Sequence, residues 1–170
     1  IAATDDSGRT STVVRAASVL GADADALDAA ETSGLLKVGE GTLSLRHPLV
    51  RSAIYGAATN ARRRQAHRAL AAAMAGTPDE DRRAWHLAAS VDEPDDEVVT
   101  ALEQAAERAR RRGGHEAATA AWSRAAELTL DPQARAQRLY FAAGSSLMAA
   151  RPLETDQLAR AALMDTTDPL

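Results

Sequence analysis

The apolar residues of this chain recur at helical spacing along most of its length. One such series is Val98, Leu102, Ala105 and Ala109, whose spacing of three or four residues places them on one face of an α-helix. Alanine and leucine supply most of these positions, and aromatic residues make up only 3% of the chain. Helices with alanine-rich faces can approach one another closely, whereas a sandwich or barrel would need larger side chains. The sequence therefore predicts a mainly α protein built from packed helices.

The first 76 residues follow a different plan from the rest. Helices are expected over residues 10–20 and 23–31, and two strand-like runs, 34–38 and 42–46, surround a glycine-flanked turn. Pro48 suits the first turn of a further helix, because the N–H that proline lacks would be unsatisfied there. Two helices, a β-hairpin and a helix in this order predict a winged-helix module with the hairpin as its wing. A trailing helix over about 61–75 completes this part, residues 1–76.

Residues 77–170 carry signals for helices alone. Asp131-Pro132 reads as an N-cap followed by proline at the first helical position, and Gly113-Gly114 ends a helix. Thr77 and Glu80 fit a capping box, in which each side chain accepts from the other's backbone N–H. Each predicted helix is amphipathic and needs a neighbouring helix to cover its apolar face.

An internal comparison at an offset of 36 residues places Trp122 over Leu158. This period is close to that of a tetratricopeptide helix pair, so residues 77–170 are predicted to form tetratricopeptide-like antiparallel pairs. The pattern Ala118, Trp122, Ala125 matches the second helix of such a unit, while Pro132 comes about two residues late. We therefore expect Trp122 to be the buried aromatic residue of a degenerate repeat.

Several segments together resemble one protein family. They are the run from Leu45 to Tyr55 with its His47-Pro48-Leu49-Val50-Arg51, then Arg62-Arg63, residues 66–70, residues 83–88 and Arg112-Gly113-Gly114. In this order they resemble the large ATP-binding transcription regulators of the LuxR family, over nearly the whole chain. The resemblance implies an ATPase, a winged-helix domain, a helical-repeat sensor and a C-terminal helix-turn-helix. Only the two middle parts have counterparts in this chain.

The resemblance implies an internal signal-relay and interaction segment of an ATP-dependent bacterial regulator. Its winged helix would dock on the adjoining ATPase domain, and its repeats would bind an unknown effector or protein. ATP or ADP would be bound only by the full-length protein, with no cofactor in this segment, and DNA only through the absent helix-turn-helix. The alternative is a free-standing helical-repeat adaptor that binds a protein on its concave face.

Catalysis and membrane insertion are not expected. The chain has no cysteine, no G-x-x-x-x-G-K-[ST] phosphate loop and no nucleophile with a nearby base. It is therefore predicted not to be an enzyme. No run approaches the roughly 20 apolar residues that span a bilayer, so a cytoplasmic location without a membrane partner is expected. The four histidines, at 47, 67, 86 and 115, lack the close spacing of metal ligands, and no metal site is predicted.

Three single residues and one helix carry the remaining expectations. By resemblance, His47 senses bound nucleotide in the full-length protein, and the alternative is that it only ends the hairpin and caps the helix that Pro48 begins. Trp85 and Trp122 could line a ligand cleft, but we expect both to be structural residues in the core between helices. The presumed recognition helix carries four carboxylates that would repel DNA phosphates, namely Asp23, Asp25, Asp28 and Glu31.

Overall fold

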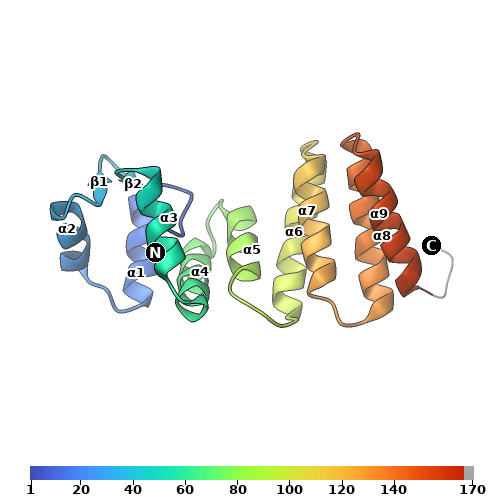
Figure 1. Cartoon of the computed structure of the whole chain (residues 1–170), viewed down its shortest axis with the longest axis horizontal. Helices are drawn as coiled ribbons and strands as arrows, with labels where there is room; N and C mark the ends of the chain where they lie inside the picture. Colours follow the sequence, from blue (N-terminus) through green and yellow to red (C-terminus); the bar gives the residue numbers. More distant parts are fainter. Residues whose placement is uncertain (167–170) are drawn as a thin grey trace. The chain divides into compact units, whose positions relative to one another are not determined.

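A computed structural model describes residues 1–166, apart from the side chain of Ala24. In this part of the chain there are nine α-helices and one two-stranded antiparallel sheet (Figure 1). The mainly helical class predicted from the sequence is confirmed. Among the described helices, none is both long enough and apolar enough to cross a membrane.

The chain divides into two compact units, residues 1–90 and 91–170. This division lies beyond the boundary expected after residue 76. The helix that follows residue 76 packs against the helix before it, so it belongs to the first unit.

The first unit contains five helices and the two strands of the hairpin, in the expected order. They are α1 (Thr10–Val19), α2 (Ala24–Thr32), β1 (Leu36–Val38), β2 (Leu43–Leu45), α3 (Pro48–Ala57), α4 (Asn60–Met74) and α5 (Glu80–Ala88). In the hairpin, Leu36 pairs with Leu45 and Val38 with Leu43. Gly41 has a φ of 72°, a left-handed conformation that glycine adopts without steric cost, and this allows the tight turn between the strands.

Two apolar clusters hold the first unit together. Ala16 of α1 packs with Leu70 and two alanines of α4, and small residues on both helices permit this close contact. Val13, on the same helix, packs with Leu36 and Leu43 of the hairpin. Because α1 contributes to both clusters, it joins the hairpin to the α4 core.

The second unit consists of α6 (Asp96–Arg111), α7 (His115–Glu127), α8 (Pro132–Met148) and α9 (Pro152–Asp165). Each helix packs against the next, with short connections between them (Figure 1). The Asp131 side chain accepts a hydrogen bond from Ala134 N at 2.7 Å, and Pro132 is the first helical residue, as predicted. Most of the buried residues in the core of this unit are alanines, and Leu102 is fully buried.

Two local expectations prove wrong. Thr77 and Glu80 do not form a capping box: α5 begins at Glu80, and Thr77 Oγ1 instead donates to Met74 O and accepts from Asp79 N. Trp85 is not in the core, since it is 42% exposed. Its neighbours Ala84 and His86 are buried instead.

Candidate functional site

The second unit contains a groove of about 730 Å³, formed by side chains of all four of its helices. A volume of this size falls within the usual range for small-molecule sites. Its walls are largely apolar, with a few polar groups. The lining residues are Glu107, Arg110, His115, Trp122, Tyr140, Phe141, Ala143, Gly144, Ser145, Leu147, Met148, Thr155 and Ala159.

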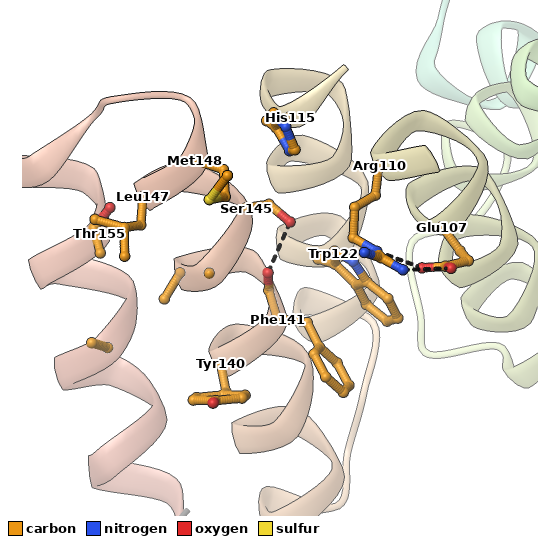
Figure 2. Close-up of a pocket in the computed structure, with 13 residues that line it drawn as sticks. Glu107, Arg110, His115, Trp122, Tyr140, Phe141, Ser145, Leu147, Met148 and Thr155 are labelled. Atoms are coloured by element: carbon orange, nitrogen blue, oxygen red, sulfur yellow. Dashed lines mark hydrogen bonds and ion pairs between the residues drawn. The ribbon is translucent and has the colours of Figure 1, made fainter. Parts of the chain in front are cut away.

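Aromatic rings form one wall of the groove (Figure 2). The ring centroids of Trp122 and Phe141 are 4.9 Å apart with the planes tilted by 40°, and those of Phe141 and Tyr140 are 5.9 Å apart. Aromatic pairs at such separations attract one another beyond the area that they bury. Trp122, which comes from α7, is thus held by α8 and presents part of its surface to the groove. The expectation that it is a wholly buried core residue is only partly met, because it is half-buried.

Small residues on α8 explain why its large side chains point into the groove. Ala142 and Ser146 are fully buried, so the neighbouring helices approach α8 closely along this line. Tyr140 and Leu147 remain more than half exposed, although the helical periodicity places both on the apolar stripe.

A charged pair, Glu107 and Arg110, lines part of the groove. The Glu107 carboxylate accepts hydrogen bonds from Arg110 at 2.8 and 2.9 Å and from Arg111 at 3.0 Å. These two guanidiniums lower the pKa of Glu107 to about 2. Of these three groups, Glu107 and Arg110 line the groove and Arg111 does not. Arg110 therefore gives the groove one guanidinium that can pair with an acidic group of a ligand.

Two further residues, His115 and Gly144, shape the wall of the groove. Nδ1 of His115 is buried and has no hydrogen-bond partner among the described residues, so it adds an unsatisfied polar group to the wall. Gly144, in the interior of α8, has nothing within 4 Å of the place a Cβ would occupy. A glycine there costs the helix about 1 kcal/mol relative to alanine, and it leaves this part of the wall open.

His47 lies in the first unit, exposed, at the N-cap of α3. Its Nδ1 accepts a hydrogen bond from Leu49 N at 3.1 Å, and Pro48 is the first helical residue. The predicted cap is therefore present, and Pro48 has its expected structural place. In a neutral imidazole whose Nδ1 accepts, the proton is on Nε2. The cap thus leaves Nε2–H as a donor for another group.

The acidic helix predicted to disfavour DNA binding is α2. Asp25, Asp28 and Glu31 are exposed on it, and Asp23 is its N-cap, accepting from Ala26 N at 3.2 Å. The surface of this helix is therefore anionic, as expected from the sequence.

Folding brings together two histidines that are far apart in sequence. Nδ1 of His67 on α4 lies 2.9 Å from Nδ1 of His86 on α5, and Nε2 of His67 lies 3.3 Å from the Tyr55 hydroxyl. Burial lowers the pKa of His67 to about 4 and also lowers that of His86. Both rings are therefore neutral at pH 7. Residues 67 and 86 are too far apart in sequence for spacing along the chain to indicate this pair.

Phe141, Met148 and Gly144 are groove residues that the sequence reading did not single out. The available signal was the adjacent pair Tyr140-Phe141. Neighbouring residues on a helix point about 100° apart, so two adjacent large aromatics cannot both lie at the centre of one buried stripe. Comparison with protein-family models, with curated proteins and with solved structures finds no match to the chain.

Proposed function

We propose that this chain is a non-catalytic signal-relay and interaction segment of an ATP-dependent, LuxR-type transcription regulator. In this proposal, residues 1–76 act as a winged-helix module that docks on an adjoining ATPase domain. The tetratricopeptide-like helices that follow receive a small effector. The single observation that carries the binding role is the aromatic groove of the second unit.

The groove favours one class of effector. Its volume of about 730 Å³ suits a drug-sized molecule, and the Trp122 and Phe141 rings offer a surface for an aromatic or apolar body. Arg110 also lines the groove, and its guanidinium can pair with an acidic group. We therefore propose a small aromatic acid as the effector.

The relay role is supported by the order of elements in the first unit and by the segment from Leu45 to Tyr55, which resembles the LuxR-type regulators. Helix, helix, hairpin and helix follow one another as in a winged helix. The exposed acidic α2 favours docking on a protein over reading of DNA. In the proposed regulator the DNA contact belongs to a separate helix-turn-helix.

The aromatic sulfonate dye 1-anilinonaphthalene-8-sulfonate is a suitable probe, because it joins an apolar body to an anion. We expect one dye molecule to bind per chain and to quench Trp122 by energy transfer, measured in a Trp85→Phe variant that retains Trp122 as its only tryptophan. Gly144→Leu should fill the groove and lower the dye affinity by about tenfold or more, since at least 1.4 kcal/mol of contact is lost. The helix itself should tolerate leucine, a better helix former than glycine.

Leu153→Ala is the matched control, because Leu153 is exposed on α9 and does not line the groove. Its dye affinity should equal that of the parent chain. Equal binding by the Gly144→Leu and parent chains would place the dye elsewhere and contradict the groove as the site. Displacement of the dye by peptides but not by aromatic acids would favour the adaptor alternative.

A further inference from the structure

A second cluster of polar groups lies in the first unit, where the N-terminal loop meets α5. Asp5, Asp6 and His86 each offer one ligand atom, and these three atoms all lie within 4.8 Å of one another. Asp5 is 2% exposed and His86 is 7% exposed. Two of the three groups are thus removed from solvent, unlike an ordinary acidic patch on a surface.

We propose that Asp5, Asp6 and His86 form a binding site for a divalent cation of the zinc class. One imidazole nitrogen and two carboxylates match the ligand set that zinc accepts, with an open position for water. Bonds of about 2.0–2.2 Å place tetrahedral ligand atoms roughly 3.3–3.5 Å apart. To reach these separations, no two of the three ligand atoms need to approach each other by more than about 1.5 Å. This site is independent of the proposed effector groove.

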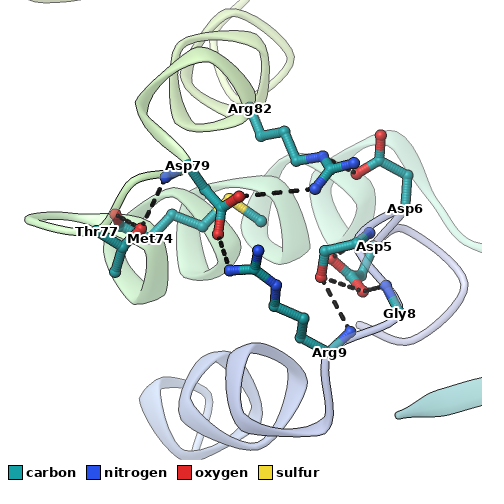
Figure 3. A network of polar contacts seen from close by, with 9 residues as sticks. Asp5, Asp6, Gly8, Arg9, Met74, Thr77, Asp79 and Arg82 are labelled. Atoms are coloured by element: carbon teal, nitrogen blue, oxygen red, sulfur yellow. Dashed lines mark hydrogen bonds and ion pairs between the residues drawn. The ribbon is translucent and has the colours of Figure 1, made fainter. Parts of the chain in front are cut away.

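Hydrogen bonds already orient the Asp5 carboxylate. One oxygen accepts from Ser7 N at 3.2 Å, and the other accepts from Ser7 Oγ and Gly8 N, both at 3.0 Å (Figure 3). A carboxylate oxygen can accept two hydrogen bonds, so the oxygen bonded only to Ser7 N retains a free lone pair. Partners of this kind fix ligating carboxylates in metal sites.

The histidine pair supplies the same support for His86. Its Nδ1 is engaged by His67, so Nε2 is the ring nitrogen left for a cation. If His86 Nδ1–H donates to His67 Nδ1, then His67 carries its proton on Nε2 and donates it to the Tyr55 hydroxyl. Ligating histidines ordinarily donate their second N–H in this way. His67 is therefore assigned as a positioning residue for His86.

Arginine side chains compete only weakly for the ligands. Arg82 Nε lies 3.5 Å from Asp6 Oδ1, and Arg82 Nη1 lies 3.6 Å from Asp79 Oδ1. Asp79 also accepts from Arg9 at 2.5 Å, and Figure 3 shows Arg82 between Asp79 and Asp6. Arg82 can therefore remain on Asp79 when a cation takes Asp6.

Titration calorimetry with Zn²⁺ on the untagged chain, with its amino terminus acetylated so that it cannot ligate, tests the site. We expect one Zn²⁺ per chain, a rise in melting temperature with Zn²⁺, and visible d–d absorption when Co²⁺ replaces it. His86→Phe and Asp6→Asn should each abolish stoichiometric binding. His67→Phe should weaken it by about 10- to 100-fold, the usual effect of losing a partner of a ligand.

His47→Ala is the control, because His47 is an exposed histidine of the same unit outside the cluster, and its Zn²⁺ affinity should be unchanged. Absence of binding to the parent chain, or equal binding by the parent and Asp6→Asn chains, would overturn the proposal. Asp6 has a side chain that is 67% exposed, so this variant decides the question even if His86→Phe fails to fold.

Discussion

Replacing Leu102 with alanine should lower the free energy of unfolding of the second unit by about 3–5 kcal/mol. Leu102 is 0% exposed in the middle of α6, and Val98, Val99, Ala105 and Ala106 of the same helix are also buried. Removing a buried leucine side chain costs its transfer free energy plus the energy of the cavity left behind. The buried valines and alanines of the same helix have short side chains that fill little of this space. The cost should therefore lie in the upper part of the usual range.

Urea unfolding followed by Trp122 fluorescence in the Trp85→Phe background measures this change. Leu130→Ala is the matched control, since it removes the same atoms from a leucine that is 78% exposed, and it should change the free energy by about 0.5 kcal/mol or less. Equal effects of the two substitutions would show that Leu102 does not occupy the core of this unit.

Replacing His47 with alanine should raise basal transcription by the proposed full-length regulator about tenfold to more than a hundredfold. The resemblance implies that this histidine contacts bound nucleotide in the resting state. A hydrogen bond to a charged phosphate is worth about 1.5–3 kcal/mol, which gives this change in a two-state equilibrium. The N-cap contact to Leu49 leaves His47 Nε2–H free to donate such a bond.

Asparagine at position 47 separates the two roles of the histidine. Asparagine is a good N-cap, so His47→Asn keeps the contact to Leu49 N but lacks the longer-reaching Nε2 donor. Both variants should raise reporter output, while only the alanine variant should destabilise α3, by about 1 kcal/mol. If both variants accumulate normally and keep the resting reporter output of the wild type, His47 acts only as a capping residue.

Several helix ends could be predicted because their signals are local, although the capping box expected from Thr77 and Glu80 does not form. Pro48 and Asp131 act on backbone groups within one turn of themselves, and the hairpin around Gly41 depends on a few adjacent residues. Burial is different, because it depends on which neighbour covers a helix face. Trp85 was therefore expected in the core, although α5 buries Ala84, His86 and Ala88 instead.

The candidate sites could be predicted only in part, for the same reason. Trp122 was recognisable as an important aromatic residue, but the groove also needs Phe141 from another helix. His67 and His86 meet only because α4 and α5 pack against each other. Contacts between residues far apart in the chain leave no spacing pattern in a single sequence.

The binding role of the second unit is tested most directly by amide chemical shifts of the ¹⁵N-labelled chain during titration with 1-anilinonaphthalene-8-sulfonate. We expect shifts concentrated on the backbone around Trp122, Phe141 and Gly144, with residues 1–90 unaffected at one dye molecule per chain. Saturable shifts confined to residues 1–90, or no saturable shifts around these three groove residues, would contradict it.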